Sequence, residues 1–140
     1  MSQRLLAGEI ADQLKRGAAE AATHAYAPYS GFRVGAALLL SDGSVVTGCN
    51  VENVSYGLTI CAERSAVVRA VSRLGPAVRI AAAAVTNLNN AASPPCGACR
   101  QVLAEFMDAD APVFFPGDAG PESRTLAELL PFGFYLNKSS

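Results

Sequence analysis

Apolar residues that recur at every fourth position predict the helices of this chain. Leu6, Ile10 and Leu14 form one such series, and charged residues fall largely on the other faces, so this segment is predicted to be an amphipathic helix. A second series consists of three alanines and Leu74, at positions 62, 66, 70 and 74. Gly75 and Pro76 follow it and are expected to end this helix. We expect helices over residues 4–22, 61–74, 96–107 and 124–130.

Short and nearly continuous apolar runs predict the strands. We expect them over residues 34–40, 45–51, 78–85 and 113–115. Asp42 and Gly43 separate the first two runs and are typical of the tight turn of a β-hairpin. Because strands alternate with helices, the pattern predicts the α/β class, with a mixed sheet covered by helices. The length of 140 residues, with no segment that resembles a linker, indicates a single domain over residues 1–140.

Charge is scarce in this sequence. Charged residues make up 16% of the chain, against about 25% in typical soluble domains, which suggests that copies of the chain cover part of its surface. The formal net charge of -1 lacks the basic excess that binding to a nucleic-acid backbone requires. The longest charge-free run, residues 80–99, contains asparagines and prolines that a membrane span would not tolerate, and no leader pattern is found. We therefore expect a cytoplasmic protein that binds neither nucleic acid nor membrane.

Three of the four cysteines lie where helices are expected to begin. Cys61 opens one predicted helix, and Cys96 and Cys99 form a Cys-x-x-Cys pair at the start of another. Helix N-termini favour the thiolate form, because free N–H groups and the helix dipole stabilise negative charge there. If the two helix starts face each other, the thiolates form a pocket for one zinc ion, and three protein ligands leave a position for water.

Glu63 follows Cys61 by two residues, and a carboxylate beside a metal that it does not bind is what a hydrolytic proton shuttle requires. A Cys-x-x-Cys pair also occurs in redox sites and in structural zinc sites. The acidic partner of Cys61 weakens the first alternative, and the lack of a fourth ligand weakens the second. We interpret Cys49 as a small buried side chain on the second strand, and His24, the only histidine, as a solvated residue at a helix end.

Five segments of the chain carry a resemblance to one enzyme family. They are residues 29–37 (YSGFRVGAA), 48–53 (GCNVEN), 61–64 (CAER), 95–101 (PCGACRQ) and 129–131 (LLP), the last followed by Phe134. In this order they resemble the motifs of the small homotetrameric, zinc-dependent cytidine deaminases, and the resemblance covers nearly the whole chain. It implies a three-layer α/β/α sandwich around a mixed five-stranded sheet.

The resemblance also implies a reaction, the hydrolytic deamination of cytidine and 2′-deoxycytidine to uridine and 2′-deoxyuridine with release of ammonia, as part of pyrimidine salvage. One Zn²⁺ per chain, on Cys61, Cys96 and Cys99, would activate a water for attack on C4 of the base. Glu63 would take a proton from the water, pass it to N3 and protonate the departing amine. Arg64 would donate hydrogen bonds to the thiolates and offset their excess negative charge.

Substrate contacts are implied in the same way. The backbone N–H of Ala62 would meet O2 of the base, and Phe32 would form a wall of the nucleoside pocket. Asn50 and Glu52 share one face of the second predicted strand, and their counterparts in the family bind the 3′-hydroxyl of the sugar.

The family resemblance implies a homotetramer whose active sites are shared between subunits. Tyr56 lies in a loop that would reach a neighbouring site. Phe134 would pack on the base bound by another chain, and Phe132 and Tyr135 are alternatives for that role.

Two other functions remain open at this point. A deaminase of the blasticidin S type would use the same zinc chemistry on a modified cytosine nucleoside, although Glu52 fits a free 3′-hydroxyl better. A non-catalytic module stabilised by zinc would need only the thiols, and Glu63 and the lack of a fourth ligand count against it.

Overall fold

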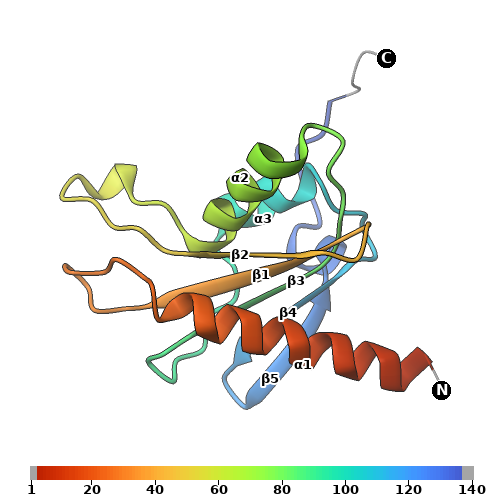
Figure 1. Cartoon of the computed structure of the whole chain (residues 1–140), viewed down its shortest axis with the longest axis horizontal. Helices are drawn as coiled ribbons and strands as arrows, with labels where there is room; N and C mark the ends of the chain where they lie inside the picture. The colour runs from red at the N-terminus through yellow and green to blue at the C-terminus, as the bar shows by residue number, and fades with distance from the viewer. Residues whose placement is uncertain (1–2, 137–140) are drawn as a thin grey trace.

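A five-stranded sheet runs through the molecule, with one long helix on one face and the other helices on the opposite face (Figure 1). The structure is a computed structural model that describes residues 3–136. Its helices are α1 (Gln3–Ala22), α2 (Ala62–Leu74), α3 (Gly97–Ala104) and α4 (Leu126–Leu129), with a short 3₁₀ helix η1 (Tyr56–Leu58). Its strands are β1 (Val34–Leu40), β2 (Val45–Cys49), β3 (Ile80–Asn87), β4 (Pro112–Gly117) and β5 (Gly120–Thr125).

The strand order, β2-β1-β3-β4-β5, decides where the loops meet. Strand β1 is antiparallel to both β2 and β3, so the C-terminal ends of β2 and β3 lie at the same edge of the sheet. Strands β3 and β4 are parallel, whereas β4 and β5 are antiparallel, which makes the sheet mixed. The loops that lead from β2 into α2 and from β3 into α3 therefore leave the sheet at one edge.

Apolar side chains fill both sides of the sheet. Ala36 and Leu38 of β1 belong to the cluster that includes residues of α2 and α3. Ala37, between them, packs with Leu14 and Ala18 of α1, because successive side chains of a strand point to opposite faces. The α/β class and the three-layer sandwich with a mixed five-stranded sheet are confirmed.

Two glycines allow helices to lie very close to the sheet. A Cβ atom at Gly35 would lie 1.8 Å from the carbonyl oxygen of Ala18, and one at Gly48 would lie 2.5 Å from the backbone nitrogen of Ala66. A side chain at either position would have to push a helix away. The second contact holds the start of α2, which carries Glu63, directly over β2.

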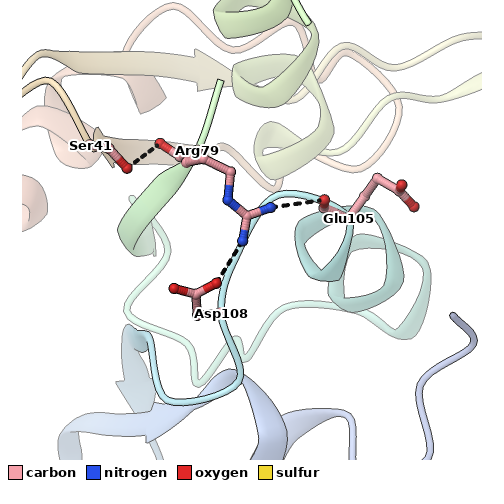
Figure 2. A network of polar contacts seen from close by, with 4 residues as sticks. All are labelled: Ser41, Arg79, Glu105 and Asp108. Atoms are coloured by element: carbon pink, nitrogen blue, oxygen red, sulfur yellow. Dashed lines mark hydrogen bonds and ion pairs between the residues drawn. The ribbon is translucent and has the colours of Figure 1, made fainter. Parts of the chain in front are cut away.

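Arg79 joins three segments at the opposite edge of the sheet, just before β3 begins (Figure 2). Its carbonyl oxygen accepts a hydrogen bond from Ser41 Oγ at 3.3 Å. Its guanidinium donates to the carbonyl oxygen of Glu105 at 3.4 Å and to Asp108 Oδ1 at 2.7 Å. An exposed ion pair of this kind contributes only about 0–1 kcal/mol, so the network mainly joins the ends of β1 and α3 to the start of β3.

The C-terminal part differs from the sequence-based prediction. Arg124 and Thr125 belong to β5, so the predicted helix over residues 124–130 is wrong at its start. The segment 120–125 has almost no apolar residues, and pairing with β4 makes it a strand. Helix α4 begins at the next residue, because Thr125 Oγ1 accepts a hydrogen bond from the backbone of Glu128 at 3.2 Å in a capping box.

The predicted hairpin turn is confirmed, and Gly43 has the positive φ, 91°, that favours glycine there. Strand β2 ends at Cys49, so the prediction of a strand over residues 45–51 is too long. Asn50 and Glu52 consequently follow the strand and lie in the loop that leads to α2. Within residues 3–136, no helix is long and apolar enough to cross a membrane.

Candidate active site

Three thiols converge at the edge of the sheet where the two loops meet. The sulfur atoms of Cys61, Cys96 and Cys99 all lie within 4.8 Å of one another, and the first two are 3.8 Å apart. Cys61 is the N-cap of α2, Cys96 is the N-cap of α3, and Cys99 is buried one turn further on. Three sulfurs that bind one tetrahedral zinc ion at about 2.3 Å lie about 3.8 Å apart, so this donor set fits zinc in both chemistry and spacing.

Hydrogen bonding among the thiols favours a thiolate at Cys61. Its pKa is lowered to about 5, first by the hydrogen bond from Cys99 and further by one from Arg64. The pKa of Cys99 is raised, first by that same hydrogen bond to Cys61 and next by burial. Metal binding needs deprotonated thiols, and the cluster therefore holds one ligand ready in that form.

The guanidinium of Arg64 lies against the thiols. Its Nη2 donates to Cys61 Sγ at 3.5 Å and to the carbonyl oxygen of Thr59 at 3.3 Å. Contact with Cys61 raises the pKa of Arg64, so its positive charge persists at any ordinary pH. Its Nε is buried, with no hydrogen-bond partner among the described residues. One donor thus remains available beside a centre that three thiolates would make negative.

Glu63 is a buried acid next to this cluster. Its side chain is 6% exposed, and burial is the first cause that raises its pKa. The carboxyl lines a cavity of about 200 Å³. The other lining residues are Phe32, Val34, Asn50, Thr59, Cys61, Ala62, Val85, Ser93, Pro94 and Cys96. A buried carboxyl with a raised pKa is suited to accept and return a proton, as general acid–base catalysis requires.

Asn50 holds the loop that carries Phe32. Its side-chain oxygen accepts a hydrogen bond from the backbone nitrogen of Val34 at 2.9 Å, and its side-chain nitrogen donates to the carbonyl oxygen of Phe32 at 2.8 Å. Asn50 is 8% exposed and lines the cavity with both of these residues. The amide therefore ties the end of β2 to the segment that leads from Phe32 into β1.

Glu52 is held by the same loop. Its Oε1 accepts hydrogen bonds from the backbone nitrogens of Tyr29, at 2.9 Å, and Ser30, at 3.2 Å. Its Oε2 accepts one from the hydroxyl of Ser30. These bonds, first among them the one from the Ser30 hydroxyl, lower the pKa of Glu52, so the buried group is a carboxylate at neutral pH.

Three predicted substrate contacts do not line this cavity of their own chain, namely Glu52, Tyr56 and Phe134. Tyr56 opens η1, is 69% exposed and stacks edge-to-face on Tyr29 with a centroid distance of 6.3 Å. Phe134 is also 69% exposed. Its backbone exchanges two hydrogen bonds with the side chain of Gln101, at 2.8 and 3.0 Å. The alternatives to Phe134 are exposed as well, since Phe132 and Tyr135 show 97% and 62% of their surface.

Some lining residues carried no signal in the sequence. Thr59 precedes the cysteine motif without a pattern of its own, and Val85 looks like any core strand residue. Ser93 and Pro94 lie in a polar loop whose course only the fold determines. Cys49, interpreted as a small buried side chain on the second strand, lies on β2 but is only half-buried.

A three-layer α/β/α fold in which three thiols and a buried carboxyl converge at the N-termini of two helices defines a zinc-dependent deaminase. Comparison with family models gives the narrower assignment. The model of the cytidine and deoxycytidylate deaminase zinc-binding region matches residues 9–115, and the chain belongs to this family. The resemblance to zinc-dependent cytidine deaminases that the five motifs carry is therefore confirmed, and the three thiols are positioned to bind the zinc ion of this family.

Individual relatives agree with this assignment. A cytidine deaminase of Halalkalibacterium halodurans is 50% identical over 118 residues, which cover 84% of this chain and 88% of that protein. One of Mycobacterium tuberculosis is 48% identical over 126 residues, or 90% of each chain. The crystal structure of a cytidine deaminase from Mycobacterium tuberculosis matches with a TM-score of 0.77 at 46% identity, over 89% of this chain and 97% of that one. The crystal structure of a cytidine deaminase from Burkholderia pseudomallei matches with a TM-score of 0.78 at 40% identity. The match covers 96% of this chain and 100% of that one.

Proposed function

We propose that this chain is an enzyme that converts cytidine and 2′-deoxycytidine, with water, into uridine and 2′-deoxyuridine and ammonia. The observation that carries the proposal is the buried carboxyl of Glu63 in a cavity beside three converging thiols. Relatives that are about half identical over most of their length bear the name cytidine deaminase, which supports the substrate.

In this proposal, Cys61, Cys96 and Cys99 hold the zinc ion. When bound, the ion supplies the Lewis acidity that makes water a nucleophile at neutral pH. Glu63 accepts a proton from the attacking water and gives it to N3 of the base, which makes C4 more electrophilic. Glu63 then carries a second proton to the exocyclic nitrogen, which leaves as ammonia while the oxygen of the water stays on C4.

Neighbouring groups would bind and orient the nucleoside. Ala62 is the first residue of α2, so its N–H has no partner within the helix and can donate to O2 of the base. Phe32 lines the cavity as a wall for the ring, and Asn50 lines it beside Phe32. An ionised carboxylate has about four acceptor positions. Hydrogen bonds from Tyr29 and Ser30 use three of the acceptor positions on Glu52, which leaves one position for the 3′-hydroxyl of the sugar.

We propose further that the enzyme is a homotetramer with shared sites. The loop around η1 exposes large apolar side chains, among them Val54 at 78% and Leu58 at 66%, and a second copy of the chain would cover them. The cavity of about 200 Å³ is also smaller than the roughly 300–1,000 Å³ of typical ligand sites. Tyr56 and Phe134 of neighbouring chains would complete it. Light scattering at assay concentration tests this assembly, and a fully active monomer would contradict it.

The products are free nucleosides, which supports a place in pyrimidine salvage rather than in nucleic-acid modification. A site of three thiolates needs reduced cysteines, which supports the cytoplasm as its compartment.

An ultraviolet assay with cytidine, 2′-deoxycytidine, cytosine, dCMP and blasticidin S tests the reaction. We expect turnover of the two nucleosides and poor use of free cytosine, because the sugar contacts supply binding energy. Glu63→Gln should keep zinc and fold but lose at least about 10²–10⁴-fold in kcat. Glu9→Gln, an exposed change on α1, is the matched control and should be fully active. Near-normal kcat in Glu63→Gln would remove this residue from the mechanism.

A further inference from the structure

The hydroxyl of Ser30 lies between two residues that the proposed function assigns to the nucleoside. It donates a hydrogen bond to Oε2 of Glu52, which is an acceptor because it is ionised. The same oxygen accepts a hydrogen bond from the backbone nitrogen of Phe32 at 3.0 Å. One small side chain thus links the carboxylate proposed for the sugar to the residue proposed as a wall for the base.

The two oxygens of Glu52 are held in different ways. Oε1 accepts from two backbone nitrogens, those of Tyr29 and Ser30, which stay in place whatever side chains the loop carries. Oε2 has the Ser30 hydroxyl as its donor. The terminal torsion of a glutamate is broad and roughly two-fold, so the backbone bonds alone leave the carboxylate plane free to turn. The hydroxyl therefore sets the direction in which the remaining acceptor position of Glu52 points.

The surrounding loop has anchors other than this hydroxyl. Its first part is anchored by backbone bonds from Tyr26 nitrogen to Asn50 oxygen, at 3.0 Å, and from Glu52 nitrogen to Tyr26 oxygen, at 2.8 Å. Its last part is anchored by the bond from Val34 nitrogen to the side chain of Asn50. Ser30 itself is exposed and lies between these anchors. Removing the hydroxyl should leave the loop held by these anchors, while it frees the carboxylate of Glu52 and the backbone nitrogen of Phe32.

We infer that Ser30 is a positioning residue that orients Glu52 toward the 3′-hydroxyl of the nucleoside sugar. The inference rests on the proposed role of Glu52 in binding that hydroxyl. Ser30 acts through Glu52, so its contribution should appear only with substrates that carry the group which Glu52 binds.

Steady-state kinetics of Ser30→Ala with cytidine and with 3′-deoxycytidine tests this. We expect kcat/KM for cytidine to fall about tenfold or more, mainly through KM, since a hydrogen bond to a charged group is lost. The fall for 3′-deoxycytidine should be less than about twofold, because the partner of Glu52 is already missing. Ser30→Thr keeps the hydroxyl and should restore most of the loss. Zinc content and thermal stability should match those of the parent.

Ser44→Ala is the matched control. It also removes a serine hydroxyl that donates to a carboxylate, Asp42 Oδ1 at 2.6 Å, but in the hairpin turn away from the cavity. It should leave both substrates unaffected. Ser30→Cys, similar in size with a weaker donor, provides the same comparison if the alanine variant does not fold.

Glu52→Gln separates the two possible failures. If this variant loses cytidine activity selectively while Ser30→Ala affects both substrates equally, or neither, the inference about Ser30 is overturned and the proposed role of Glu52 stands. If Glu52→Gln affects cytidine and 3′-deoxycytidine alike, the proposed sugar contact fails, and the inference fails with it. Selective loss in both variants, with rescue by threonine, supports the inference.

Discussion

Gly48→Ala is expected to disturb the active site without touching it. The new Cβ atom would lie 2.5 Å from the backbone nitrogen of Ala66 and 2.9 Å from the carbonyl oxygen of Ala62. Both atoms belong to the backbone of α2 and cannot rotate away, and ordinary contact between such atoms is at about 3.5 Å or more. Helix α2 must therefore move away from β2 by roughly 1 Å. Ala62 directly precedes Glu63, so the displacement passes to the carboxyl proposed as the acid–base group.

The cost follows from the same geometry. Overpacking of a core typically costs about 1–3 kcal/mol of unfolding free energy, and a clash with backbone alone should give a value near the upper end. A misplacement of about 1 Å at a catalytic group can cost about 10²-fold in rate. Denaturant unfolding measures the first effect, and kcat/KM for cytidine together with zinc content measures the second.

Gly17→Ala is the matched control for this experiment. Its Cβ atom would lie 3.6 Å from side-chain atoms of Ala37 and Thr47, which is ordinary contact, and the position is within α1. Alanine in place of a helical glycine should stabilise the protein by about 0.5–1 kcal/mol and leave activity unchanged. Normal stability and normal activity in Gly48→Ala would show that α2 does not pack against β2 as closely as described, and would refute the reasoning.

Three further predictions concern the metal, the C-terminal segment and pH. Cys96→Ser should lose the zinc ion, whereas Cys49→Ser, outside the thiol cluster, should keep it. Elemental analysis of the purified variants measures this, and retention of zinc by Cys96→Ser would contradict the ligand set. Gln101→Ala should speed amide hydrogen exchange at Phe134 by about 2–10-fold with little change in global stability, because it removes a hydrogen-bond acceptor whose net contribution is about 0.5–1.5 kcal/mol. Unchanged exchange would mean that the side chain of Gln101 does not hold the segment around Phe134. Hydrogen bonds from the α4 N-cap lower the pKa of Glu128, so this group stabilises the fold above its unfolded pKa of about 4.3, and the stabilisation is lost as pH falls through the lower folded pKa. Unfolding free energies of Glu128→Gln should consequently fall less steeply than those of the parent below about pH 4.3, and identical slopes would argue against the capping box.

Local sequence alone was sufficient for the helices that carry the chemistry and for the candidate metal ligands. The apolar spacing from Ala62 onward predicts α2, because a helix repeats its faces at short and regular intervals. Cys96 and Cys99 are three residues apart, and this spacing at a helix start puts two sulfurs near one ion. The prediction that Glu63 moves the proton rests on its place two residues after Cys61. Each of these inferences depends on neighbours within one or two turns of the same segment.

Tertiary structure decided what depends on distant segments. Cys61 meets Cys96, 35 residues later, only because β2 and β3 end at the same edge of the sheet. Strand β5 has no apolar pattern of its own and exists through its pairing with β4. The polar alternation of Asn50 and Glu52 indicates a shared face, but not that their side chains hold the loop around Ser30. Long-range strand pairing and loop contacts determine these positions, and no local periodicity records them.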